Sequence, residues 1–240
     1  GKIWMPKSGI FGIFPMIIGS IYVTAGAIVV GVPTALLLAI FLAFYCPKKL
    51  YAPLKAMVNL LAGIPSVVYG FFGLVVLVPW VREIGRTLHR GGNGSSMITA
   101  SILLGMMILP TIIGLTESAL RAVPTQYYEG AVALGGTHER AIFTVVLPAA
   151  KSGVVAAIVL GIGRAIGETM AVIMVAGNQP RMPEGIFRGV RTLTANIVIE
   201  MGYASGLHRE ALIATGVVLF VFILLLNFCV ALLKRGKNYE

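Results

Sequence analysis

The sequence predicts an all-α, polytopic membrane protein, and three observations support this fold class. Of the 240 residues, 58% are hydrophobic and 12% are charged, whereas a soluble domain carries about 25% charged residues. Long runs lack any Asp, Glu, Lys or Arg, and a helix of about 20 apolar residues spans the hydrocarbon core of a bilayer. The basic residues behind the net charge of +10 stand in short clusters between these runs, which argues against a nucleic-acid-binding domain.

We expect one membrane domain over residues 1–240, with five helical spans. The spans are predicted at roughly 14–45, 57–79, 97–116, 153–177 and 211–233. The first run is longer than a bilayer requires, so either part of it lies in the interface or its helix is tilted or kinked at Pro33. The fourth run is interrupted only by Arg164 and Glu168.

The connections between the spans differ in character. Residues 80–93 are polar and contain several glycines, which predicts a turn-rich loop. Residues 117–151 are mixed in charge, and Pro124 and Pro148 bound two expected helical pieces around Gly135–Gly136. Lys and Arg residues divide evenly between the two sides, so the positive-inside rule does not orient the chain.

Arg164 and Glu168 are the most informative residues of the sequence. A charged side chain at the bilayer centre costs roughly 2.5–3.5 kcal/mol on insertion scales, so such residues pair, line a wet path, or do both. A helical wheel places both on a small-residue face with Gly167, which predicts that the pair points into the helix bundle. In one interpretation the Arg164 guanidinium binds an oxyanion and Glu168 neutralises it when the site is empty. In the alternative, the pair is a structural salt bridge that holds two helices together.

A second candidate is the stretch from Gly63 to Gly70. Its early glycine and Pro65 favour a helix that breaks and restarts, with Ser66 facing an anion. The alternative is an ordinary start of a membrane helix with proline in its first turn. Thr111 and Thr169 are weaker candidates, because a helix hydroxyl usually bonds to backbone.

Residues 117–151 also contain a spaced motif: Glu129-Gly130-Ala131, then Gly135, then Leu147-Pro148. The spacing resembles the EAA signature of bacterial ABC-importer permeases, with Gly130 in place of the usual alanine. This resemblance implies a type I ABC-importer permease fold with a cytoplasmic coupling (EAA-type) loop, here 124–148, that docks onto a separate ATPase. Its coupling residues would be Glu129, Ala131, Gly135, Leu147 and Pro148. The sequence lacks a Gly-x-x-x-x-Gly-Lys-Ser/Thr string, so we expect no ATP hydrolysis, and no enzymatic activity, in this chain.

Three further stretches are similar to the permeases of bacterial phosphate importers, the Pst system, and more similar to its PstC-like than to its PstA-like subunit. They are residues 63–70, 163–171 and 191–196. The resemblance implies that the chain forms half of a phosphate translocation path in the bacterial cytoplasmic (inner) membrane. The residues along the path would be Arg164, Glu168, Ser66 and Thr169.

The resemblance also implies the partners. These are a PstA-like permease, a PstB-like ATPase dimer that binds the ATP, an external phosphate-binding protein, and membrane lipid. We expect no metal and no cofactor in the chain itself. Permeases of this type have six spans, so a first span upstream of Gly1 is expected.

Three alternatives stay open. The chain is a permease for another oxyanion, such as molybdate or sulfate, if selectivity lies in the external binding protein. It is an ion-coupled transporter or an anion channel if the EAA-type spacing arose by chance. It is a regulatory membrane subunit if it contains no path through the membrane.

Overall fold

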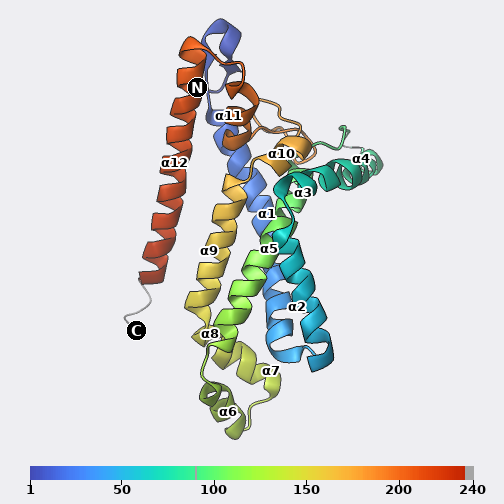
Figure 1. Ribbon diagram of the computed structural model, residues 1–240, viewed down its shortest axis with the longest axis vertical. Coiled ribbons are helices and arrows are strands. Elements are labelled where there is room, and N and C mark those ends of the chain that lie inside the picture. Colours follow the sequence, from blue (N-terminus) through green and yellow to red (C-terminus); the bar gives the residue numbers. More distant parts are fainter. Residues whose placement is uncertain (90, 236–240) are drawn as a thin grey trace.

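The computed structural model describes residues 1–89 and 91–235, which form an elongated bundle of helices (Figure 1). A short antiparallel hairpin, β1 (Trp4–Met5) and β2 (Ile10–Phe11), precedes the helices. The helices are α1 (Phe14–Ile40), α2 (Lys48–Gly63), α3 (Ser66–Phe72), α4 (Val78–Thr87), α5 (Met97–Arg121), α6 (Thr125–Ala133), α7 (His138–Ala141), α8 (Leu147–Ala149), α9 (Lys151–Gly167), α10 (Met170–Val175), α11 (Leu193–Met201) and α12 (Gly206–Arg235). Three short π-helical stretches connect or extend these helices. One extends α1 over Phe41–Tyr45, one joins α3 to α4 over Gly73–Leu77, and one joins α7 to α8 over Ile142–Val146.

Several helices have the length and hydropathy of membrane spans. Within the described residues, four stretches qualify: Phe14–Tyr45, Ser66–Thr87, Met97–Arg121 and Gly206–Leu225. The helical stretches His138–Ala149 and Lys151–Gly167, bent by 70° at Ala150, make a fifth if they are one span. The chain is therefore a multi-pass membrane protein.

Two of the expected spans are not continuous helices. The range 57–79 crosses a break at Ile64–Pro65, where both residues have extended backbone with ψ of 126° and 143°. Proline lacks an amide hydrogen and disfavours the helical conformation of the residue before it, which accounts for this break. The range 153–177 crosses a second break at Glu168, whose ψ is 130°. The fourth expected span therefore consists of two helices, α9 and α10.

The expected turn-rich loop at 80–93 is also wrong in its first half. Helix α4 continues through Thr87, with Val81 and Gly85 buried and Arg82 and Arg86 exposed. The polar residues that indicated a loop thus occupy one face of an amphipathic helix.

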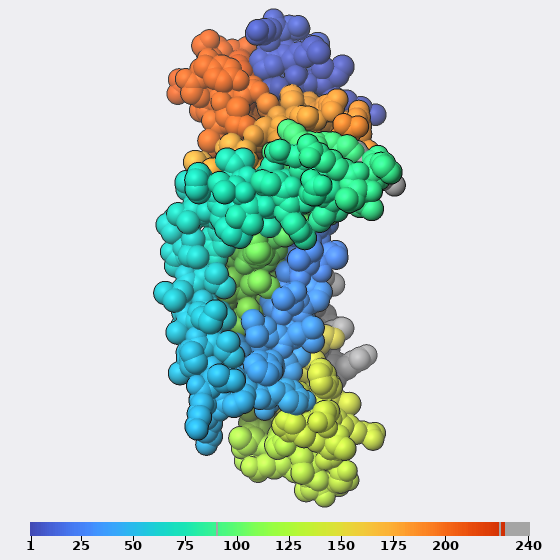
Figure 2. Space-filling model, turned by 90° about the vertical axis from the view of Figure 1, so that its right-hand side faces the viewer, coloured from blue at the N-terminus to red at the C-terminus, as the bar shows by residue number. Residues whose placement is uncertain are grey.

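Helices α1, α5 and α9 form the centre of the bundle, and small residues allow them to approach closely. A Cβ added to Gly31 of α1 would lie 2.8 Å from the Gly105 carbonyl oxygen of α5. A Cβ added to Gly153 of α9 would lie 2.4 Å from the Ala119 Cβ of α5. Small residues at such contacts are typical of helix packing in membranes. Figure 2 shows α5 recessed between α1 and α2.

The two ends of the bundle differ. At one end, named the α6–α7 end, the chain turns back through α6 and α7 (Figure 1). Here the buried carboxylate of Glu117 ties α2 to α5: it accepts hydrogen bonds from Lys55 Nζ at 2.6 Å, Tyr51 Oη at 2.7 Å and Arg121 Nε at 2.9 Å. At the other, the α11 end, lie the N-terminal hairpin, α4, α11 and the start of α12.

Candidate functional site

Arg164 lies in the last turn of α9 with its side chain exposed. Its Nη1 donates a hydrogen bond to Thr111 Oγ1 of α5 at 3.2 Å. The expected ion pair with Glu168 is not formed: no ion pair between described residues joins them. The reason is local, because α9 ends at Gly167 and the four-residue spacing no longer places the two side chains on one helix face. The prediction of a paired counter-ion was wrong in geometry.

Glu168 instead organises the start of α10. Its Oε1 accepts hydrogen bonds from the backbone amides of Thr169 at 3.1 Å and Ala171 at 3.2 Å. A carboxylate at a helix N-terminus satisfies amides that lack partners within the helix and interacts favourably with the helix dipole. The Thr169 hydroxyl donates to the Gly167 carbonyl at 3.3 Å. Glu168 and Thr169 thus define the second helix break.

The two helix breaks lie near one another because α3 packs against α10. A Cβ added to Gly70 of α3 would lie 3.0 Å from the Ala171 Cα. Ser66 is the first residue of α3, directly after Pro65. Tyr69, one turn further, donates its hydroxyl to the Leu61 carbonyl at 2.9 Å, across the first break. Ser66 therefore begins the half-helix α3 that packs on α10, and Glu168 lies in the break just before α10.

The small residues of α9 are buried against α5 in one part of the helix and lie in open space in the other. Ala157 and Gly161 are buried, and a Cβ on Gly161 would lie 2.7 Å from Ile112 of α5. Gly163 and Gly167, which flank Arg164, have open space where a Cβ would stand. The expectation that Arg164 points into the bundle of this chain is therefore wrong. The guanidinium lies on a surface that this chain leaves open.

The EAA-type motif forms a helix–turn–helix at the α6–α7 end. Glu129 and Ala131 lie on α6, and the chain turns at Gly135, whose φ of +84° favours glycine. A Cβ on Gly136 would lie 2.8 Å from the Ala131 carbonyl oxygen, so the second glycine is also required for the turn. Leu147 and Pro148 begin α8, which leads into α9. The sequence placed the two helical pieces and their turn correctly.

An aromatic contact braces this loop against α1. The Tyr128 hydroxyl and His138 Nδ1 are 2.9 Å apart and share a hydrogen bond. The His138 ring also packs edge-on against Tyr45, at the end of the first span, with centroids 5.1 Å apart.

At the start of α7, hydrogen bonds from the Glu139 backbone amide and from Thr137 hold the pKa of the Glu139 carboxyl below its usual range.

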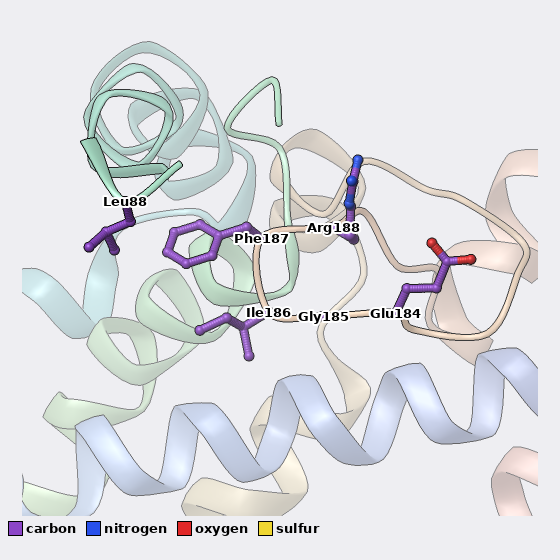
Figure 3. Close-up of a pocket in the computed structure, with 6 residues that line it drawn as sticks. All are labelled: Leu88, Glu184, Gly185, Ile186, Phe187 and Arg188. Atoms are coloured by element: carbon purple, nitrogen blue, oxygen red, sulfur yellow. The ribbon is translucent and has the colours of Figure 1, made fainter. Parts of the chain in front are cut away.

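A groove of about 640 Å³ lies at the α11 end, between the end of α4 and the loop that precedes α11. It is lined by Leu88, Glu184, Gly185, Ile186, Phe187 and Arg188. Figure 3 shows the Phe187 ring extending toward Leu88, whereas Arg188 and Glu184 leave the loop in other directions. The groove combines an apolar wall with charged side chains, one of each sign.

Near Arg164, sequence reasoning ranked one residue low and missed another. Thr111 was only a weaker candidate, expected to bond to backbone, but it accepts the hydrogen bond from Arg164. Thr194 of α11 donates its hydroxyl to the Glu168 carbonyl at 3.2 Å and so touches the second break directly. Neither contact has a local sequence signal, because the partners are 53 and 26 residues apart.

Comparison with known proteins identifies relatives across most of the chain. Residues 35–239 match the sequence profile of a family described as "Binding-protein-dependent transport system inner membrane component". A probable ABC transporter permease protein, YqgH of Bacillus subtilis (strain 168), is 38% identical over 224 residues, which cover 91% of this chain and 71% of the relative. The phosphate transport system permease protein PstC of Mesorhizobium japonicum is 36% identical over 239 residues, which cover 93% of this chain and 73% of the relative.

Solved structures share the fold. An inward-facing structure of the MetNI methionine ABC transporter superposes with a TM-score of 0.67 at 21% identity, covering 98% of this chain and 99% of that chain. A bacterial ABC transporter involved in the import of the acidic polysaccharide alginate superposes with a TM-score of 0.70 at 14% identity, covering 93% and 79%. The expected fold class, an all-α permease of the type I ABC-importer fold, is confirmed.

Proposed function

The chain belongs to the family of binding-protein-dependent transport system inner membrane components, and on this premise we propose that it forms half of the path of an ATP-driven phosphate importer. As a member of this family it is a non-catalytic membrane subunit, and a partner subunit hydrolyses the ATP. The substrate rests on similarity: relatives that are 33–36% identical over most of the chain are named phosphate transport system permease protein PstC.

The observation that carries the proposal is the setting of Arg164. Its guanidinium is exposed on a surface left open by this chain, one turn before the helix break at Glu168, and the half-helix α3 that follows the other break packs on α10. A planar guanidinium binds two oxygens of a phosphate at once. In transporters, substrate sites are commonly formed by discontinuous membrane helices. We propose that Arg164 attracts the anion and that Thr111 orients the Arg164 side chain. Ser66 and Thr169 supply the hydroxyls of the path.

Glu168 takes a different role in the proposal from the one expected of it. Its carboxylate is occupied by the amides at the start of α10 and does not neutralise Arg164. We propose that Glu168 maintains the backbone conformation of the second helix break. The positive charge of Arg164 is then not cancelled by Glu168 within this chain, which favours the entry of an anion.

The partners follow from the same premise. A PstA-like permease covers the open surface around Arg164 and supplies the other half of the path. A PstB-like ATPase dimer receives the α6–α7 end, which is cytoplasmic, and an external phosphate-binding protein docks at the α11 end. The chain lies in the bacterial cytoplasmic (inner) membrane and carries no cofactor of its own.

The test is ATP-driven uptake of labelled phosphate into proteoliposomes that contain the complete complex. Arg164→Gln is compared with Arg209→Gln, a matched removal of an exposed arginine near the start of α12. Loss of uptake in Arg164→Gln alone, from an assembled complex that still hydrolyses ATP, supports the proposal. Uptake near the wild-type rate would remove Arg164 from the path. If the wild-type complex took up molybdate or sulfate in place of phosphate, the proposed substrate would be wrong.

A further inference from the structure

A buried ionic cluster lies at the α11 end, away from the hydroxyls and the arginine assigned to the path. Its centre is Glu200 of α11, which is 5% exposed. One carboxylate oxygen accepts from Arg191 Nη1, and the other accepts from the Trp4 indole at 2.8 Å and contacts His208 Nε2 at 2.9 Å. We name these four residues the outer cluster. It joins the N-terminal hairpin, the segment before α11, α11 itself and the start of α12.

Arg191 makes more contacts than charge neutralisation requires. Its Nη1 also donates to Asn196 Oδ1 at 3.0 Å, and its Nε donates to the Asn178 carbonyl at 2.9 Å. The Asn178 side chain in turn donates to the Ile173 carbonyl, in the last turn of α10, at 2.7 Å. The guanidinium therefore links buried Glu200 to the C-terminal end of α10.

The residues on either side of Arg191 hold both ends of α10. The Val190 amide donates to the Ala176 carbonyl at 2.9 Å, just beyond the end of α10. Thr194 donates to the Glu168 carbonyl, just before its start. The Arg191 backbone is itself wedged against α1, because a Cβ on Gly19 would lie 2.5 Å from its carbonyl oxygen. Residues 190–194 thus form a clamp over α10.

Helix α10 depends on such a clamp. It has six residues, whereas isolated helices shorter than about 12–15 residues are marginal even in favourable sequences. Its position is therefore set by tertiary contacts. Among the bonds that hold residues 190–194 in place, the charge-assisted bonds of Arg191 are the strong ones, because bonds to ionised groups are roughly twice as strong as neutral ones.

We propose that Arg191 is a positioning residue: anchored by Glu200, it holds the 190–194 clamp on α10 and thereby fixes the helix break beside Arg164. The clamp reaches the outer surface through His208 and Tyr203, whose rings pack together with centroids 5.9 Å apart. The consequence for transport rests on the proposed function, but the positioning of α10 does not.

The experiment measures the accessibility of α10 directly. In the complete complex, with Cys46 and Cys229 replaced by serine, Val172→Cys places a thiol on α10 at a position that is 1% exposed. Val146→Cys supplies the control thiol, in place of a buried valine (3% exposed) at the α6–α7 end. A small water-soluble maleimide labels each variant in proteoliposomes without phosphate or ATP. The labelling rate is compared in backgrounds that carry Arg191→Met, Arg191→Lys, Glu200→Gln or the exposed-residue control Arg209→Met.

Loss of the charge-assisted bonds should raise labelling of the α10 thiol by about tenfold or more in Arg191→Met and Glu200→Gln. Labelling of the control thiol should be unchanged, and Arg209→Met should change neither rate. Arg191→Lys should also raise labelling of the α10 thiol, because an ammonium that pairs with Glu200 cannot reproduce the fork that also holds the Asn178 carbonyl.

Three results would overturn the proposal. In one, the α10 thiol stays protected in Arg191→Met. In another, the α10 thiol and the control thiol become reactive together, which indicates general loosening. In the third, the α10 thiol is labelled at the wild-type rate in Arg191→Lys, which would show that Arg191 only neutralises Glu200. Phosphate uptake by the same variants is measured separately, with ATP hydrolysis monitored, and should fall in Arg191→Met. A wild-type complex that moved no phosphate would refute the proposed function and leave the labelling result valid.

Discussion

Leu134 at the tip of the α6–α7 loop offers a direct test of coupling to an ATPase. Its side chain is 92% exposed, and it lies next to the Gly135 turn. Three other apolar side chains of this loop are also exposed: Tyr127, Val132 and Phe143. Large apolar side chains exposed together on one loop are typical of a protein contact. We predict that Leu134→Ala weakens binding of the ATPase to the permease pair.

The size of the effect follows from the exposure. Leu134→Ala removes the Cγ and both Cδ groups, each worth about 0.8 kcal/mol when buried. Because almost the whole side chain is free to be covered, the loss amounts to about 1–2.4 kcal/mol, depending on how completely docking buries it. At 1.4 kcal/mol per factor of ten, the dissociation constant rises about 5- to 50-fold.

The assay is titration of labelled ATPase subunit onto permease pairs in nanodiscs. Leu134→Met keeps the apolar volume and should bind nearly as wild type. Leu88→Ala truncates another exposed leucine, at the α11 end (57% exposed), and should leave ATPase binding unchanged. Equal affinity of Leu134→Ala and wild type would show that the tip of this loop is not covered by the ATPase. The loop would then need another partner surface.

Three further predictions concern packing. Glu117→Gln leaves Lys55 and Arg121 without their counter-ion; since these are 27% and 47% exposed, we expect a loss of about 1–3 kcal/mol in a denaturation series, less than for a fully buried pair. Gly153→Ala places a Cβ 2.4 Å from a neighbouring Cβ and should lower the unfolding free energy by about 1–3 kcal/mol; an unchanged value would contradict this contact. Gly19→Ala displaces the Arg191 carbonyl and should raise maleimide labelling of the α10 thiol. Continued protection of this thiol would show that the contact between Gly19 and Arg191 does not hold the 190–194 clamp in place.

The sequence predicted most of what depends on local pattern. Apolar runs without charges marked the helices, and the glycine pair at Gly135–Gly136 marked the turn between α6 and α7, because backbone strain at a turn is a local property. The glycine and proline of the 63–65 stretch also carried the right signal, since a broken helix was one of its two interpretations. The span assignment nevertheless ran through it, because hydropathy does not register a break of two residues.

The break at Glu168 could not be predicted in the same way. Nothing in the residues 164–171 forbids a helix: the stretch contains no proline, and its glycine alone does not end one. The break is stabilised from outside, by Thr194 on the Glu168 carbonyl, while the Glu168 side chain caps the new helix. Tertiary contacts overrode local propensity, as they commonly do. The pairing of Arg191 with Glu200 is likewise a contact between two separate elements.

The arrangement of these contacts indicates which element is free to move. Helix α5 is held along its length: its start is capped by residues of the α10 and α4 connections, its middle packs on α1 and α9, and Glu117 anchors its far end. Helix α9 carries Arg164 and is packed on α5, to which Arg164 is also hydrogen-bonded through Thr111. Helix α10 has six residues; Ala171, Val172 and Val175 bury it against its neighbours α3 and α5, and hydrogen bonds hold both of its ends. A change that releases the clamp therefore acts first on the two ends of α10, while α5 and α9 keep their contacts with one another.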